Sequence, residues 1–273
     1  MIETIHIFDE FSQESDQLTA EQRNKKRLAL DPFVYGILQS KYGAHLKAFW
    51  ITHTLPKATG SYFVLVERRI HPNIEFVLQN AAYFGRNWGL VVVCSDMNLE
   101  YLRDICAPHQ DSIHFLPLFH GNPDTTQAKA DYNSLLKQAD FYKNLPGEHH
   151  IFLQVDTYFR KPIPEAWKEY DLVAAPYEWD ESSVGGGLSY RKKQSMIAIC
   201  QTQADTSIDE DSFVCQGAKA LGMKLPPFET GITYVAESCL YEDPIGVHQW
   251  WTFFSPKEME PDIFHSLLSL EID

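Results

Sequence analysis

The sequence predicts an α/β fold in which a mostly parallel sheet is flanked by helices. Apolar runs of strand length at residues 62–66, 90–94 and 113–118 alternate with segments whose apolar residues recur at helical spacing. Continuous apolar runs are typical of strands that are covered on both faces, as in parallel sheets. With 273 residues, 44% of them hydrophobic, the chain is long enough to bury a sizeable core.

The elements are expected in a regular order along the chain. A surface helix is expected in the charged stretch 17–30. Pro72 fits the first turn of a helix that continues to residue 84. Three glycines at 185–187 are expected to lead into a short strand. The remaining expected elements are helices at 99–105, 126–144 and 196–199, strands at 151–153, 172–174 and 188–190, and a weakly helical tail at 252–273.

The net charge of −14 limits the classes of partner. A nucleic-acid-binding surface usually carries a basic patch, and none is expected here. The short basic clusters at 25–27 and 191–193 are interpreted as solvated helix faces.

Cysteine usage and apolar run lengths indicate the compartment. Five cysteines are scattered singly without a CxxC pair, so neither a disulfide framework nor a zinc site is predicted. The N-terminus lacks the pattern of a signal peptide, the apolar runs are too short for a transmembrane segment, and there is no glycosylation sequon. A cytoplasmic protein is expected, of unknown oligomeric state.

The most informative segment is the buried strand at 151–153, because it runs into Gln154, Val155 and Asp156. In open α/β sheets, ligands bind beyond the carboxyl ends of the strands. A carboxylate at that position can hold a divalent cation, which in turn can bind phosphates. The alternative is an aspartate that opens a turn or caps a helix.

Two other strand ends carry polar residues. Val66, Glu67 and Arg68 end the first strand, where backbone and side chains could bind a base or ribose. Asp96 ends the second strand and could also contact a ribose. The alternatives are a charged loop and a turn-forming aspartate.

Three later features could also carry chemistry. Gly186 and Gly187 allow close backbone approach to a ligand, unless they form only a flexible loop. Adjacent carboxylates at Glu210 and Asp211 could supply a general base, or simply begin a helix. His248 follows a glycine and precedes two tryptophans, so it is either a metal ligand or a histidine packed among aromatic residues.

With these residues in place, the chain resembles the GT-A glycosyltransferases, and most closely a domain-of-unknown-function family grouped with them. The resemblance covers roughly residues 61–251. The segments that carry it are Val66-Glu67-Arg68, His71-Pro72-Asn73 with Asn80, Tyr132-Asn133-Ser134-Leu135-Leu136, residues 141–148, residues 152–156, Ala175-Pro176, Gly186-Gly187-Leu188-Ser189 with Arg191-Lys192, Glu210-Asp211 and Gly246-Val247-His248 with Trp250.

This resemblance implies a GT-A-like fold and a transferase that uses a nucleotide-sugar donor. It implies that Asp156 is the carboxylate of a DxD-like motif that binds Mn²⁺ or Mg²⁺, and that His248 completes the metal site. The sequence departs from the pattern at Gln154, which leaves one fewer anionic ligand.

The resemblance also implies roles for the remaining candidates. Gly186 and Gly187 would line the donor sugar, and Asp211 with Glu210 would be the base of an inverting reaction. UDP-hexose is the default donor, and the acceptor is a glycan, a protein or a lipid-linked sugar. Three parts are expected: an N-terminal helical segment at 1–57, a catalytic domain at 58–251 and a tail at 252–273. Residues 1–57 could be a lid, an acceptor-binding arm or a dimer contact.

Two other functions remain open, and a third is excluded. The chain could be a non-catalytic GT-A-like module that binds a sugar nucleotide or a protein partner, which the neutral Gln154 favours. A nucleotidyltransferase would favour a basic glycine-rich loop near the N-terminus, and none is visible. A dehydrogenase is excluded because no GxGxxG follows the first strand.

Overall fold

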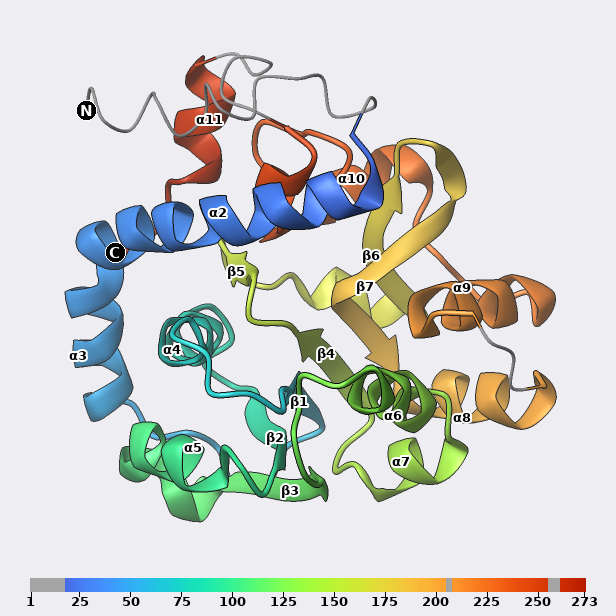
Figure 1. Cartoon of the computed structure of the whole chain (residues 1–273), viewed down its shortest axis with the longest axis horizontal. Coiled ribbons are helices and arrows are strands. Elements are labelled where there is room, and N and C mark those ends of the chain that lie inside the picture. Colours follow the sequence, from blue (N-terminus) through green and yellow to red (C-terminus); the bar gives the residue numbers. More distant parts are fainter. Residues whose placement is uncertain (1–17, 205–207, 255–260) are drawn as a thin grey trace.

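The computed structural model describes residues 18–204, 208–254 and 261–273. Its centre is a six-stranded sheet in the order β3-β2-β1-β4-β7-β6 (Figure 1). Strands β1 to β4 are mutually parallel, and β7 runs antiparallel to β4 and β6. The predicted α/β fold class is therefore confirmed. The strands of this sheet are β1 (Ser61–Val66), β2 (Gly89–Ser95), β3 (Ile113–Phe119), β4 (His149–Leu153), β6 (Leu172–Tyr177) and β7 (Asp180–Lys192).

Helices cover both faces of the sheet. The first four strands follow the order 3-2-1-4 of doubly wound folds. None of the described helices is both long and apolar enough to cross a membrane. The helices are α2 (Ala20–Leu38), α3 (Ala44–Thr52), α4 (Ile74–Phe84), α5 (Leu99–Ile105), α6 (Thr126–Leu136), α7 (Ala139–Asn144), α8 (Lys193–Thr202), α9 (Glu210–Ala220), α10 (Phe228–Tyr234) and α11 (Pro261–Leu267).

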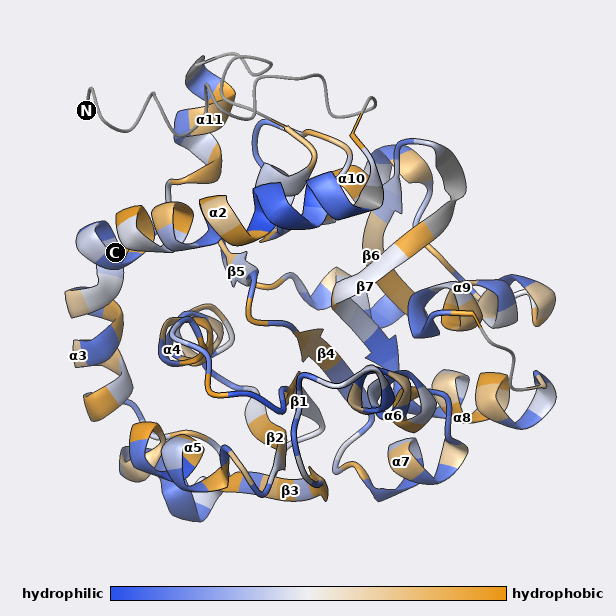
Figure 2. Cartoon of the chain, viewed as in Figure 1, coloured by the Kyte–Doolittle hydropathy of each residue, from blue (hydrophilic) through white to orange (hydrophobic). Residues whose placement is uncertain are grey.

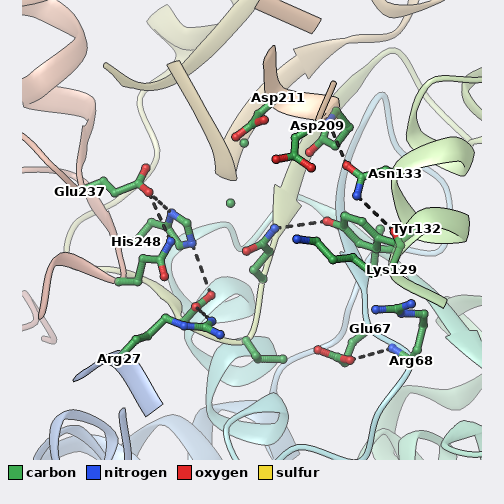
Figure 3. Close-up of a pocket in the computed structure, with 18 of the residues that line it drawn as sticks. Arg27, Glu67, Arg68, Lys129, Tyr132, Asn133, Asp209, Asp211, Glu237 and His248 are labelled. Atoms are coloured by element: carbon green, nitrogen blue, oxygen red, sulfur yellow. Dashed lines mark hydrogen bonds and ion pairs between the residues drawn. The ribbon is translucent and has the colours of Figure 1, made fainter. Parts of the chain in front are cut away.

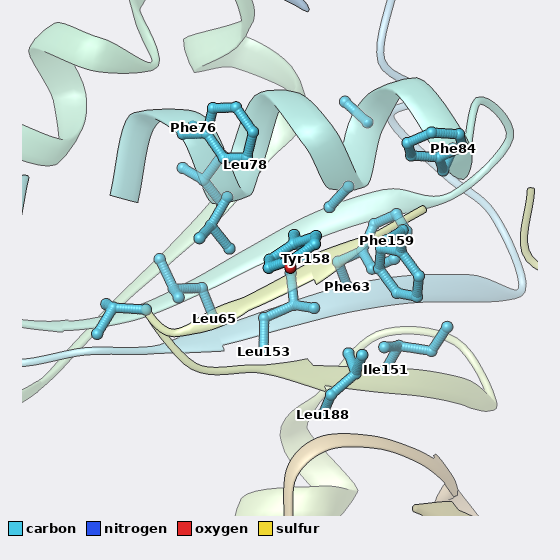
Figure 4. Close-up of a cluster of buried hydrophobic side chains, with 14 of the residues drawn as sticks. Phe63, Leu65, Phe76, Leu78, Phe84, Ile151, Leu153, Tyr158, Phe159 and Leu188 are labelled. Atoms are coloured by element: carbon cyan, nitrogen blue, oxygen red, sulfur yellow. The ribbon is translucent and has the colours of Figure 1, made fainter. Parts of the chain in front are cut away.

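The central strands are buried on both faces because their alternate side chains enter two separate cores. Phe63 and Leu65 of β1 pack with Leu153 of β4 in a core that also includes α4 (Figure 4). Val64 and Phe152 point to the opposite face, where α7, α8 and α9 cover them. This double burial explains why the strands are continuously apolar in sequence.

Helix α2 is polar in its first half and more apolar in its second half (Figure 2). It begins with a capping box in which Gln22 N donates to Thr19 Oγ1 and Thr19 N donates to Gln22 Oε1. Its amino-terminal half is mostly hydrophilic, whereas β3 is mostly hydrophobic (Figure 2). Leu30 and Val34 of α2 are buried in the same core as β1 and β4.

Some expected elements differ from the structure. The single helix predicted at 126–144 is wrong, because the chain breaks at Lys137 and Gln138 into α6 and α7, and the Tyr142 hydroxyl donates to Leu136 O across the break. The glycines at 185–187 lie inside β7 instead of preceding a strand. Helix α4 begins at Ile74, after Pro72. Parts of the expected terminal segments, residues 1–17 and 255–260, lie outside the described residues.

A second, three-stranded sheet was not predicted. It has the order β5-β9-β8, with β5 (Thr157–Phe159) antiparallel to β9 (Gly246–His248) and β8 (Val235–Ala236) parallel to β9. Strands of two or three residues leave no periodic signal in sequence. The first residue of β5 and the last residues of β8 and β9 lie at the same end of this small sheet. That end is close in sequence to the end of β4, because only residues 154–156 separate β4 from β5.

Candidate functional site

A cavity of about 360 Å³ lies beyond the carboxyl ends of β1 and β4 (Figure 3). These strands are neighbours in the sheet but not in sequence, so the chain order reverses between them. Such a switch point is where open α/β sheets bind ligands. The cavity is lined by every residue that the sequence singled out except one: Val66, Glu67, Arg68, Gln154, Asp156, Gly186, Gly187, Glu210, Asp211 and His248.

The exception is Asp96, which lies at the end of β2 outside the cavity. Its side chain is half exposed, accepts a hydrogen bond from Gly121 N at 3.3 Å, and is 3.5 Å from His120 Nδ1. The structure thus leaves Asp96 in the turn-forming arrangement that was its alternative interpretation.

The small sheet positions three ionisable side chains together. Asp156 immediately precedes β5, His248 ends β9 opposite Thr157, and Glu237 follows β8. His248 Nε2 is 3.4 Å from Asp156 Oδ1, and His248 Nδ1 is 3.1 Å from Glu237 Oε1. The imidazole therefore lies between two carboxylates, as Figure 3 shows for Glu237 and His248.

Neighbouring charges together, more than burial, set the pKa values of His248 and Asp156. Burial disfavours a charged His248, but Glu237 and Asp156 together raise its pKa to about 10. Burial alone would raise the pKa of Asp156, but His248 and Arg27 hold it well below its usual range. Asp156 is therefore ionised and His248 is protonated in this arrangement.

Several polar atoms of this group have charge partners but no hydrogen bond. Asp156 Oδ1, both ring nitrogens of His248 and Glu237 Oε2 are buried without a hydrogen-bond partner in the described part of the chain. A histidine whose second nitrogen faces a carboxylate is a recurrent feature of metal sites. These residues fit a divalent cation held by Asp156 and His248, with Glu237 orienting the imidazole.

Asp156 and His248 alone provide fewer protein ligands than a complete metal site. Among residues 18–204, 208–254 and 261–273, no group of three or more His, Cys, Asp or Glu side chains has a geometry that would hold a metal ion. Mg²⁺ is commonly bound by one or two protein ligands together with phosphate oxygens and water. A cation here would also displace the proton of His248.

The three glycines of β7 are required by three different neighbours. A Cβ atom at Gly185 would overlap Glu237, and one at Gly187 would overlap the His248 ring. At Gly186 it would lie 2.7 Å from Glu210 Oε1. The glycines therefore allow the strand to pass between Glu237 and His248 on one side and the start of α9 on the other.

Glu210 and Asp211 begin α9 but have different surroundings. Glu210 forms a buried, bidentate pair with Arg191, with N–O distances of 2.9 and 3.1 Å. Asp211 accepts from the Tyr177 hydroxyl at 2.9 Å and from Ser212 N at 2.8 Å, and it lines the cavity. Burial and the nearby carboxylates raise the pKa of Tyr177, so its hydroxyl remains a donor.

Four cationic side chains line the same cavity: Arg27, Arg68, Arg69 and Lys129. Arg69 is paired with Glu67 at 2.9 Å, and Arg68 lies 5.7 Å from the ring centroids of Phe119 and Tyr132. Six carboxylates of the described residues also line the cavity, namely Glu67, Asp156, Asp209, Glu210, Asp211 and Glu237, so its lining is not positive overall. The cations therefore offer an anionic ligand individual contacts and not a net positive field.

The interpretation of the two basic clusters as solvated faces is wrong for their key members. Arg27 reaches the cavity from α2, Lys26 is fully buried, and Arg191 is 1% exposed. Sequence reasoning also missed Glu237, Lys129 and the bond from Gln154 Nε2 to the Tyr132 hydroxyl at 3.2 Å. Tyr132 lies in a segment that carries the family resemblance, which is the one signal that could have found it.

Part of the chain matches a protein family whose function is not known. Residues 119–248 match the model of a family described as "Protein of unknown function (DUF5672)". No curated protein sequence gives a significant match.

Three of the solved structures that the chain resembles are glycosyltransferases, each at 13% identity or less. They include the mannosyltransferase PcManGT from Pyrobaculum calidifontis in complex with GDP-Man and Mn²⁺, with 13% identity, a TM-score of 0.43 and coverage of 75% of this chain and 66% of that one. The glycosyltransferase GlyE of Streptococcus pneumoniae TIGR4 has 10% identity, a TM-score of 0.47 and coverage of 73% and 56%. Mouse Xyloside xylosyltransferase 1 has 8% identity, a TM-score of 0.49 and coverage of 74% and 99%. The chain spans less than two thirds of the first two structures, and at these TM-scores the likeness assigns no donor, metal or activity to it.

Proposed function

We propose that the protein is a GT-A-like glycosyltransferase that moves a sugar from a nucleotide-sugar donor to an acceptor hydroxyl. The observation that carries this proposal is that Asp156, His248 and Asp211 line one cavity at the switch point of the sheet. The resemblance requires these residues to meet, although they lie far apart in sequence. The proposed catalytic domain is 58–251, and Arg27 adds a contribution from the preceding segment.

The donor would bind with its diphosphate near Asp156 and its nucleoside toward the end of β1. Val66, Glu67 and Arg68 are the proposed contacts of the base or ribose, and Gln154 lines the same cavity. The space kept open at Gly186 and Gly187 suits the donor sugar. UDP-hexose is the proposed donor class, and the acceptor is a glycan, a protein or a lipid-linked sugar.

Asp211 is the proposed general base. Its carboxylate takes the proton of the acceptor hydroxyl while that oxygen forms the new bond to the anomeric carbon, and the bond from this carbon to the diphosphate oxygen breaks. Attack from the face opposite the leaving group inverts the anomeric centre. The Tyr177 hydroxyl fixes one oxygen of Asp211, and the Glu210–Arg191 pair fixes the start of α9.

Asp156 and His248 are the residues that would hold Mn²⁺ or Mg²⁺. When bound, such an ion offsets negative charge on the departing nucleoside diphosphate. The cationic side chains of the cavity would share this task, which is relevant because Gln154 contributes no charge.

The second candidate is a non-catalytic module that binds a sugar nucleotide or a protein partner. The neutral Gln154 and the ion pair between Arg27 and Asp156 favour it, because both reduce the negative charge available to a metal ion. Binding without turnover would identify this alternative.

The proposal is tested by thermal stability in a panel of nucleoside diphosphates and nucleotide sugars, with and without Mn²⁺. A ligand at 100 times its Kd stabilises the folded state by about 2.7 kcal/mol, so a donor should raise the Tm by several degrees. Asp156→Ala should abolish the Mn²⁺-dependent part of this shift. An unchanged shift in Asp156→Ala would contradict the metal role, and a folded wild-type protein that responds to no nucleotide would contradict the transferase proposal.

A further inference from the structure

Helix α2 presents a stripe of three residues to the turn that carries Asp156. Arg27, Asp31 and Tyr35 are spaced four residues apart and so share one face of the helix. Arg27 Nη1 donates to Asp156 Oδ2 at 2.9 Å, and the Tyr35 hydroxyl donates to Thr157 O at 2.9 Å. Figure 1 shows α2 in blue crossing next to β5. The helix is therefore held in register with the turn between β4 and β5.

Asn73 links helix α2 to the turn between β4 and β5. Its side-chain amide donates to Asp31 Oδ2 at 2.7 Å and to Val155 O at 3.2 Å. Helix α2 thus contacts the turn directly at Asp156 and Thr157, and Asn73, which precedes α4, links Asp31 of the helix to Val155. Such a contact positions the Arg27 guanidinium relative to the metal-site carboxylate.

The ion pair of Arg27 is only partly formed. One terminal nitrogen donates to Asp156, and the other donates to Asn24 Oδ1 at 3.1 Å on the same helix instead of to the carboxylate. The Arg27 side chain is 30% exposed and faces the cavity. A guanidinium has five N–H donors, so capacity to bind a further anion remains.

We infer that Arg27 belongs to the donor site, where it competes with the divalent cation for Asp156 and donates to the diphosphate when the donor is bound. This inference rests on the proposed function. A cation between Asp156 and His248 would lie beside the positive guanidinium, and the two would repel. A diphosphate between them satisfies both, because its oxygens accept from the guanidinium and bind the cation.

The neutral Gln154 is consistent with this arrangement. Replacing an anionic ligand by an amide weakens cation binding, and a neighbouring guanidinium weakens it further. With a weaker metal ion, the cationic side chains of the protein would neutralise a larger part of the negative charge of the diphosphate. Arg68 and Lys129 line the same cavity as Arg27. Arg27 would thereby make cation binding depend on the diphosphate.

The test measures two affinities that should change in opposite directions. Mn²⁺ alone, and then inorganic pyrophosphate and UDP or GDP with Mn²⁺ present, are titrated by calorimetry into the wild type, Arg27→Gln and Lys25→Ala. Lys25 is an exposed lysine on the same helix, so its substitution removes the same charge at a position outside the cavity. Arg27→Lys is the second variant, since it keeps the charge but not the planar fork.

Arg27→Gln should bind Mn²⁺ alone about two- to fivefold more tightly than the wild type, because a partly exposed competing ion pair is lost. It should bind pyrophosphate and the nucleoside diphosphate about tenfold more weakly, because a hydrogen bond to a charged group is lost. Lys25→Ala should change neither, and Arg27→Lys should be intermediate for the diphosphates.

Unchanged diphosphate affinity in Arg27→Gln, or Mn²⁺ affinity that does not tighten, would overturn the inference and leave Arg27 as a structural contact of α2. If the wild type binds nucleoside diphosphates and Arg27→Gln binds them equally well, the inference alone fails. If the wild type binds none of them, the proposed function fails as well.

Discussion

Two arginine–carboxylate pairs flank the same cavity, Arg191–Glu210 and Arg27–Asp156, and they differ in burial and in the number of hydrogen bonds that join them. Arg191 and Glu210 are 1% and 6% exposed, and two nitrogens bind two oxygens. Arg191 also donates to the Tyr142 hydroxyl and to Ser189 Oγ. Arg27 makes one bond to Asp156, is 30% exposed, and leaves Asp156 Oδ1 without a hydrogen-bond partner in the described part of the chain.

The difference separates a pair that stabilises the fold from a pair that can exchange partners. A buried pair with all its hydrogen bonds satisfied gains nothing from a ligand, and breaking it leaves an uncompensated charge. A pair with unsatisfied atoms next to a cavity can release one partner when a better one arrives. We therefore expect substitutions at the closed Arg191–Glu210 pair to change stability, and substitutions at the open Arg27–Asp156 pair to change ligand binding.

The largest effect is expected at Asp211, which adjoins the closed pair but is not part of it. Asp211→Asn should lower turnover by about 10² to 10⁴-fold, because it removes the proposed base, while donor binding and stability remain. Single-turnover transfer or donor hydrolysis, together with nucleotide titration, measures this. A fully active variant would exclude Asp211 as the base.

Breaking the closed pair should destabilise the protein. Glu210→Ala leaves the Arg191 guanidinium buried without its carboxylate and should lower the free energy of unfolding by about 3–5 kcal/mol. Urea denaturation followed by fluorescence measures it. The double variant Arg191→Met with Glu210→Leu is the control, since it removes both charges and should recover most of the loss; a stable Glu210→Ala protein would contradict the comparison.

Asp31, on the same face of α2 as Arg27, is a half-buried carboxylate whose hydrogen-bond partner, Asn73, is neutral. Burial raises its pKa from 3.8 to about 6, so the folded protein holds this proton more tightly than the unfolded chain. Stability is therefore lost as the pH rises from about 3.8 to 6, by roughly 3 kcal/mol at most. Asp31→Asn should be more stable than the wild type above pH 6 and equal to it near pH 3; a pH-independent difference in unfolding free energy would contradict this.

The smallest effect on stability is expected at the open pair itself. Arg27→Gln should change the free energy of unfolding by no more than about 1 kcal/mol, since partly exposed ion pairs contribute little. Thermal and urea unfolding at low and moderate salt measure the change. A loss as large as that of Glu210→Ala would show that Arg27 is structural and would remove the contrast.

The main sheet and most of the candidate site could be predicted from sequence, because both are encoded locally. Continuous apolar runs mark β1, β2 and β4, and Asp156 is recognisable as the carboxylate that follows such a run. Asp211 and His248 were found from adjacent acids and from a histidine among aromatic residues, with the family resemblance supplying their roles. Those roles stay predictions.

What could not be predicted depends on contacts between distant segments. Glu237 follows a strand of two residues with no periodic pattern, and only the pairing of β8 with β9 brings it to His248. Arg27 occurs in a run of basic residues that is indistinguishable from a solvated helix face. Likewise, the need for glycine at 185–187 comes from side chains of α9, β9 and residue 237, which no local sequence pattern reveals.

The small sheet also has a consequence for the order in which the protein acquires its binding capacity. Domains can begin to fold during synthesis, from the N-terminus onward. The six strands of the main sheet and the turn with Asp156 are complete once Lys192 of β7 has been made, whereas β8 and β9 come later. A nascent chain at that stage can form the Arg27–Asp156 contact but lacks Glu237 and His248. Assembly of the proposed cation site is thus coupled to the last strand, so an interrupted chain would contain the main sheet without the complete group of Asp156, Glu237 and His248.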